Sequence, residues 1–103
     1  MPALVVLFDL QDEAARQAYE KWAQTTDVPT VKGLGSINDF KVYRLDSIMG
    51  STANTPYQYC EVIDINDMEA LGADLATDTM KRVAQEFQSF ALNPIFMISE
   101  QIA

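Results

Sequence analysis

The chain has 103 residues, of which 49% are hydrophobic and 21% charged, the size and balance of one globular domain over residues 1–103. Its formal net charge of −8 disfavours nucleic acid and anionic membrane surfaces as partners. The sequence has no histidine and one cysteine, which excludes Ser-His-Asp catalysis, histidine-ligated haem and the usual zinc and iron sites. We therefore expect no metal and no cofactor. Because the apolar start lacks a basic segment and one cysteine suits a reducing compartment, we also expect a cytoplasmic protein.

The first third of the chain predicts a strand and then a helix. Residues 3–10 are a compact apolar run with β-branched side chains, typical of a strand buried on both faces. From Asp12 the apolar residues follow a helical period, and one face of the predicted helix carries Ala15, Ala18, Tyr19 and Trp22. Thr25-Thr26-Asp27 and then Pro29 are expected to end this helix, because the residue before a proline disfavours helical backbone.

The rest of the chain predicts two strands, a broken helix and a last strand. Asn66-Asp67 is a helix-capping pair, and Gly72 with Thr77-Asp78 predicts a break in the helix that follows. Asn93-Pro94 is expected to stop that helix. The β-branched and aromatic segments between these signals place strands over residues 36–46, 57–65 and 95–102.

The element order is therefore βαββαβ. Right-handed crossovers that each skip one strand give a four-stranded antiparallel sheet with spatial order 4-1-3-2 and helices on one face. The sequence thus predicts an α+β fold, a ferredoxin-like sandwich.

The first strand also predicts how the domain assembles. It places Leu4, Val6, Phe8 and Leu10 on one face and Ala3, Val5 and Leu7 on the other. Two helices cover only one face of the sheet, and a bare apolar face is unusual for a monomer. We expect a second copy to cover it, which gives a face-to-face homodimer.

Several segments match a known superfamily. They are Val-Val-Leu-Phe in the first strand, Pro29 followed by residues 33–44, Tyr-Cys-Glu-Val-Ile-Asp at 59–64, the broken helix from Met68, and Asn93-Pro94. With these features the chain resembles the dimeric α/β-barrel proteins, and among them the RedY/HapK-like proteins, which are encoded with the enzymes of prodigiosin-type tripyrrole pigments. The resemblance implies a role in making the bipyrrole half of such a pigment. It implies no catalytic residue, because its motifs specify architecture.

Three aromatic residues are candidates for binding a flat ligand. Tyr19 and Trp22 share the stripe of the first helix that points at the sheet. They either form plain core or make an aromatic wall for a heteroaromatic ring. Tyr43 and Arg44 lie on opposite faces of the second strand, so one of them faces the same space.

Glu61, Tyr59 and Arg44 are the candidate catalytic residues. A carboxyl in the middle of a strand is unexpected, and burial under the helices would raise the pKa of Glu61 into a useful acid–base range. Alternatively, Glu61 pairs with Lys41 or Arg44 across the strands. Tyr59 shares the face of Glu61 and could donate to a developing oxyanion. Arg44 could clamp a carboxylate, or it could form a structural salt bridge.

Three functions remain open on the sequence alone. The first is a cofactor-free enzyme that binds a pyrrole or bipyrrole intermediate and promotes cyclisation, dehydration or tautomerisation by acid–base chemistry. The second is a non-catalytic carrier, or an accessory partner of a larger biosynthetic enzyme. The third is a cofactor-independent monooxygenase, which the resemblance to the superfamily allows.

Overall fold

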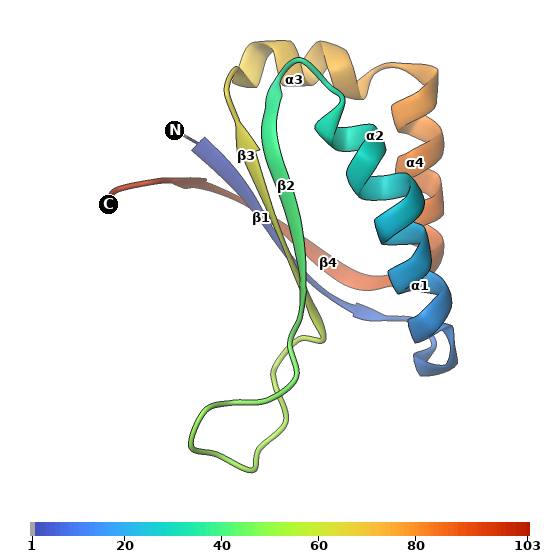
Figure 1. The fold of residues 1–103 in the computed structure, drawn as a ribbon, viewed down its shortest axis with the longest axis vertical. Coiled ribbons are helices and arrows are strands. Elements are labelled where there is room, and N and C mark those ends of the chain that lie inside the picture. The colour runs from blue at the N-terminus through green and yellow to red at the C-terminus, as the bar shows by residue number, and fades with distance from the viewer. Residues whose placement is uncertain (1) are drawn as a thin grey trace.

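A computed structural model describes residues 2–103 and contains a four-stranded antiparallel sheet with helices packed on one face (Figure 1). The strands are β1 (Pro2–Leu10), β2 (Ile37–Arg44), β3 (Tyr59–Ile65) and β4 (Ala91–Glu100). Their order across the sheet is β2-β3-β1-β4, the predicted 4-1-3-2 arrangement read from the other edge. The ferredoxin-like topology is confirmed, and the loop between β2 and β3 projects beyond the sheet (Figure 1).

The first helical region is longer than the sequence predicts. A 3-10 turn (Glu13–Ala15), α1 (Arg16–Trp22), a π-helical turn (Ala23–Asp27) and α2 (Val28–Lys32) follow one another without a break. The predicted end near Thr25 and Pro29 is therefore wrong. The N–H of Val28 donates to the carbonyl of Ala23, which widens the turn directly before Pro29, a residue that has no N–H to donate. The wider turn lets the helix pass through the proline.

The second helical region begins and breaks where the sequence predicts. The side chain of Asp67 accepts hydrogen bonds from the N–H groups of Glu69 and Ala70 and so caps α3 (Met68–Leu75). Thr77 accepts from the N–H of Met80 and caps α4 (Asp78–Phe90). These two caps confirm the predicted start and the predicted break at Thr77-Asp78, whereas Gly72 lies inside α3 and does not interrupt it.

The predicted role of Asn93-Pro94 as a helix stop is wrong. Helix α4 already ends at Phe90, and both residues lie inside β4. Asn93 has a positive φ of 50°, and the pairing of β1 with β4 shifts register between Leu7 and Asp9. A proline is tolerated here because β4 is an edge strand and a bulge releases the local ladder of hydrogen bonds.

The two faces of the sheet differ in their cover. Val6 and Phe8 of β1 face the helices and are fully buried. On the opposite face Val5 pairs with Val62 on one side and Met97 on the other, and no helix lies over this face in Figure 1. Ile95 and Met97 of β4 remain 42% and 38% exposed within the single chain. The apolar second face of the sheet is therefore real, as the alternation in β1 predicts.

Candidate functional site

A cavity of about 290 Å3 lies between the sheet and helices α2, α3 and α4. Its wall is mostly apolar and includes Leu4, Phe40, Ile63, Met80, Phe87 and Phe96. The ionisable residues that line it are Asp27, from the π-helical turn, and Glu61, from the middle of β3. The volume is at the small end of ligand pockets, which span about 300–1,000 Å3, so the cavity suits a small, mainly apolar molecule.

Glu61 is a buried carboxyl with no ion-pair partner in the described part of the chain. Its side chain is 4% exposed, and Oε2 has no hydrogen-bond partner among residues 2–103. Val6 and Val42 are its neighbours on the two adjacent strands, so apolar side chains flank it on both sides. Burial, and then the negative charge of Asp27, raise the pKa of Glu61 to about 8.

The alternative in which Glu61 pairs with Lys41 or Arg44 is wrong. Lys41 Nζ lies 3.6 Å from Asp39 Oδ2, and Arg44 forms ion pairs with Glu20 and Asp46. Glu61 therefore belongs to the other interpretation that the sequence left open, a desolvated carboxyl under the helices.

Asp27 is a site residue that the sequence reasoning missed. It is 4% exposed, and burial raises the pKa of its carboxyl to about 7. Tyr19, Ala23, Asp27 and Val31 follow one another at intervals of four residues, and all are buried. This spacing was the available signal, since it puts a carboxyl on the inner stripe of a helix. Because the helix was expected to end near Pro29, Asp27 was not placed on its buried stripe.

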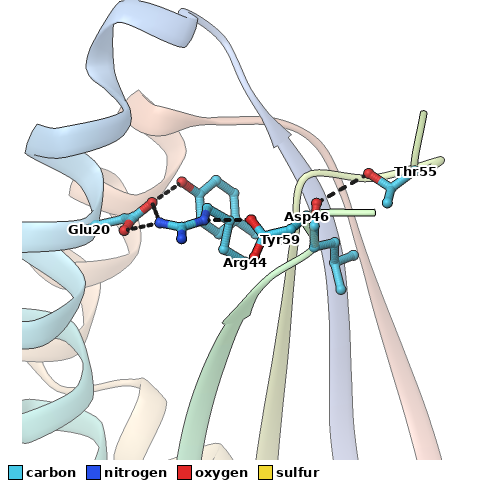
Figure 2. A network of polar contacts seen from close by, with 6 residues as sticks. Glu20, Arg44, Asp46, Thr55 and Tyr59 are labelled. Atoms are coloured by element: carbon cyan, nitrogen blue, oxygen red, sulfur yellow. Dashed lines mark hydrogen bonds and ion pairs between the residues drawn. The ribbon is translucent and has the colours of Figure 1, made fainter. Parts of the chain in front are cut away.

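Tyr59 and Arg44 meet at a second polar site, here called the Glu20 cluster (Glu20, Arg44, Asp46 and Tyr59). Tyr59 Oη donates to Glu20 Oε2 at 2.7 Å, and Arg44 Nη1 donates to the same carboxylate at 3.0 and 3.2 Å. Arg44 Nε donates to Asp46 Oδ1 at 2.7 Å. Figure 2 shows that these contacts join α1, β2, β3 and the start of the projecting loop. The cluster holds the first helix over the sheet.

The charges of the Glu20 cluster are mutually satisfied. The hydrogen bond from Tyr59, with that from Arg44, lowers the pKa of Glu20. Burial and the hydrogen bond to Glu20 raise the pKa of Tyr59 to about 12, so its phenol stays protonated. The structural salt bridge proposed as an alternative role for Arg44 is thereby confirmed.

The structure separates the candidate catalytic residues into two places. Tyr59 and Arg44 line a second pocket of about 460 Å3 between α1 and the edge strand β2, whereas Glu61 lines the cavity beneath α2, α3 and α4. The ring of Tyr59 is buried against Phe8, with centroids 5.5 Å apart. The Tyr59 hydroxyl points out toward Glu20 (Figure 2).

The three aromatic candidates do not form one wall, although the rings of Tyr19 and Trp22 are neighbours. Tyr19 lines the second pocket, is fully buried, and its Oη has no partner among the described residues. Burial and then the charge of Glu61 raise the pKa of Tyr19, which keeps its phenol neutral. Tyr43 lies opposite Cys60 on the face away from the helices, is half-exposed, and reaches the rim of the second pocket.

Trp22 is half-buried between the first helix and α4. Its Nε1 donates to Glu86 Oε2 at 2.7 Å, and its ring lies 5.5 Å from Phe90 and 6.1 Å from Tyr19. The residues that line the two pockets do not include Trp22. A ligand in the cavity would therefore not contact the indole, which packs against Tyr19 and the surrounding core. Ala18, placed on the same stripe by the sequence, is exposed.

Two further features of the described residues concern metal binding and membrane spans. Within residues 2–103, no group of three or more Asp, Glu, Cys or His side chains is arranged to hold a metal ion. No helix in the described part of the chain is long and apolar enough to cross a bilayer.

Fold and site together define a ferredoxin-like α+β domain with an acidic cavity between its helices and its sheet. Many proteins share this strand order and helix placement, so the fold alone does not identify a family. Comparison of the sequence with known protein families does. The chain belongs to the HapK family, since the family model described as REDY-like protein HapK matches residues 2–102.

Solved structures agree with this assignment. The chain is 34% identical to HapK from Hahella chejuensis over 99% of this chain and 93% of that one, with a TM-score of 0.81. A dimeric ferredoxin-like protein from Jannaschia sp. CCS1 is 15% identical, with coverage of 97% and 98% and a TM-score of 0.73. SnoaB, a cofactor-independent oxygenase from Streptomyces nogalater, is 12% identical, with coverage of 99% and 93% and a TM-score of 0.73. These last two share the fold alone. Among curated proteins, none matches the sequence.

Proposed function

We propose that this chain is a small, cofactor-free protein of secondary-metabolite biosynthesis that binds a pyrrole or bipyrrole intermediate of a prodigiosin-type pigment. Membership of the HapK family supports the biosynthetic role. The observation that carries the proposal is the unpaired carboxyl of Glu61 in a small, mainly apolar cavity beside Asp27. A flat aromatic ring suits the apolar wall, and the carboxyls supply the chemistry.

The proposed chemistry is acid–base catalysis by the two carboxyls. Groups with pKa values close to the working pH exchange protons most effectively, and those of Asp27 and Glu61 are raised to about 7 and about 8. Near neutral pH the carboxylate of Asp27 accepts a proton from one ligand atom, and the carboxyl of Glu61 delivers a proton to another. Such a transfer is what cyclisation, dehydration or tautomerisation of a pyrrole precursor needs. Arg44 and Tyr59 act as positioning residues that hold the first helix through Glu20.

The test is pigment formation by cells that lack their own HapK-family protein and carry this chain instead. Glu61→Gln keeps the shape of the side chain and removes its proton, so the rate of pigment formation should fall about 100-fold or more. Glu69→Gln, an exposed change on α3, is the matched control and should leave the rate unchanged. Unaltered pigment formation with Glu61→Gln would eliminate Glu61 as the acid–base group.

A carrier role is the second candidate, and the apolar wall of the cavity favours it. A carrier needs to bind the intermediate but not to move its protons. Full pigment formation by the Glu61→Gln variant, together with unchanged ligand binding, is the result that supports the carrier. A larger biosynthetic enzyme that receives the intermediate would then be a partner.

We also propose that the chain forms a homodimer through the open face of the sheet. Ala3, Val5 and Leu7 of β1 and Ile95 and Met97 of β4 line this face. An obligate interface would bury about 2,000 Å2 or more in total. Light scattering at micromolar concentration should give about twice the chain mass of 11.5 kDa, and a stable monomer would contradict the proposal. Val5→Asp should cause aggregation or unfolding.

A further inference from the structure

We propose that Asp27 and Glu61 form one recognition site for N–H donors, which accepts a neutral or cationic N–H heterocycle and rejects an anionic one. The inference rests on the proposed function and specifies the class of ligand for the same cavity. It also assigns a role to Asp27.

The geometry gives a ligand in the cavity two acceptor groups from opposite layers. Asp27 comes from the helical layer and Glu61 from the sheet, and both line the same cavity. Both side chains are only 4% exposed, and Glu61 Oε2 has no partner among residues 2–103. Buried acceptors are nearly always hydrogen-bonded in folded proteins. A ligand N–H is the group that satisfies this oxygen.

The charges around the cavity oppose an anion. None of the residues that line it is a lysine or an arginine. The cations of α2 and β2 are engaged elsewhere, since Arg44 binds Glu20 and Asp46, while Lys32 and Lys41 bind Asp39. Lys81 and Arg82 of α4 are exposed and line a separate surface pocket. An anionic ligand would meet two carboxyls in a desolvated space with no opposite charge to compensate.

Protonation makes the pair both donor and acceptor. Burial is the largest cause of the raised pKa of Asp27, about 7, and of Glu61, about 8. Tyr19 from α1 lies near both carboxyls, and its phenol stays neutral because burial, and then the charge of Glu61, raise its pKa. Cys60 is next to Glu61 on β3, and burial, and then the charge of Glu61, raise the pKa of its thiol. At pH 7 Glu61 is therefore mostly protonated and Asp27 is about half protonated, so the pair can both donate and accept a hydrogen bond. An N–H heterocycle complements that state.

Three probes of similar shape test this selectivity in calorimetric titrations at pH 7. They are 2,2′-bipyrrole, 2,2′-bifuran, which has no N–H, and 2,2′-bipyrrole-5-carboxylate, which adds a negative charge. We expect bipyrrole to bind with one site per chain, and the other two to bind at least tenfold more weakly. Equal affinity for bipyrrole and bifuran, equal affinity for the carboxylate, or no binding of any probe would overturn the inference.

Two variants assign the selectivity to the carboxyls. Glu61→Met keeps the length of the side chain and removes the acceptor, so the preference for bipyrrole over bifuran should fall at least threefold. Asp27→Asn removes a charge, so the discrimination against the carboxylate should fall at least threefold. Glu69→Gln should preserve both preferences, and unchanged preferences in Glu61→Met and Asp27→Asn would overturn the inference.

These titrations measure binding alone and the pigment assay measures turnover, so the inference and the proposed function can fail separately. Lost selectivity with intact dependence of pigment on Glu61 rejects only the inference. Retained selectivity with full pigment from Glu61→Gln rejects only the acid–base role.

Discussion

The Glu20 cluster and the Asp27–Glu61 cavity shift the pKa of a carboxyl in opposite directions. In the cluster the carboxyl is paired and its pKa is lowered, whereas in the cavity the carboxyls are buried and their pKa values are raised. Glu20 lies where α1 meets the sheet and receives hydrogen bonds from Tyr59 and Arg44, which lower its pKa. Glu61 lies two residues beyond Tyr59 on the same strand and face, yet its Oε2 has no partner among the described residues. Its pKa is raised to about 8. Hydrogen-bond partners lower the pKa of Glu20, whereas burial raises that of Glu61.

This difference separates a polar site that joins elements from one that is a candidate for ligand binding. Paired groups such as Arg44 and Glu20 join elements and add stability without leaving bonding capacity for a ligand. An unpaired buried carboxyl destabilises the fold, so its presence in a cavity is a reason to assign it a function.

The largest effect should be a fall in stability with rising pH. Because the pKa values of Asp27 and Glu61 are raised in the folded state, the fold binds more protons than the unfolded chain between their ordinary values, 3.8 and 4.5, and about pH 7–8. The free energy of unfolding should therefore fall by about 1.4 kcal/mol per pH unit for each proton retained, which for the two carboxyls together is about 6 kcal/mol between pH 5 and pH 8. Urea titrations across this range measure it.

The double variant Asp27→Asn/Glu61→Gln should flatten this slope. Glu20 acts in the opposite sense, since its lowered pKa gives stability that is lost as the pH falls through its ordinary value of 4.5. Glu69→Gln is the control and should retain the wild-type slope. The same slope in the double variant would place the titrating groups elsewhere.

Removal of the Tyr59 ring from the Glu20 cluster should cause the next largest fall in the free energy of unfolding. The ring of Tyr59 is buried against Phe8 and Tyr19, so Tyr59→Ala should lower the free energy of unfolding by about 3 kcal/mol. Tyr59→Phe removes only the hydroxyl and should cost about 1 kcal/mol. Thermal and urea unfolding of both variants measure the difference. Equal losses would mean that the hydrogen bond to Glu20, and not packing, supplies the stability.

The salt bridges of Arg44 should contribute little. The Arg44 side chain is 44% exposed, and surface ion pairs are worth about 0–1 kcal/mol and weaken with salt. Arg44→Met should therefore lower the free energy of unfolding by less than about 1 kcal/mol at low salt, and by less still at 1 M salt. A loss of several kcal/mol in the free energy of unfolding would show that these ion pairs affect stability as strongly as the carboxyls of the cavity do.

Removal of metal ions should have the smallest effect. Since the cavity offers two carboxyls and no histidine, we expect dialysis against a chelator to leave both stability and ligand binding unchanged. Metal analysis of the purified protein checks this directly. Stoichiometric iron, copper or haem would contradict it.

Sequence patterns alone predict the order of the elements and that Glu61 and Tyr59 share one face of their strand, but they do not show that this face lies under the helices. The alternation in β1, the helical period after Asp12 and the caps at Asp67 and Thr77 are signals that act between near neighbours, and they give the ferredoxin-like topology. The side chain of Glu61 shares the helix side of β3 with Tyr59 because strand residues alternate.

Only the tertiary structure decided which charges meet. Asp27 turns inward because a π-helical turn carries the helix past Pro29, an arrangement that local rules disfavour. Arg44 binds Glu20 rather than Glu61 because α1 packs over the end of β2, a contact between residues 24 positions apart. Short-range patterns define elements, but the burial and pairing of a charge depend on which elements come together, and packing alone sets that.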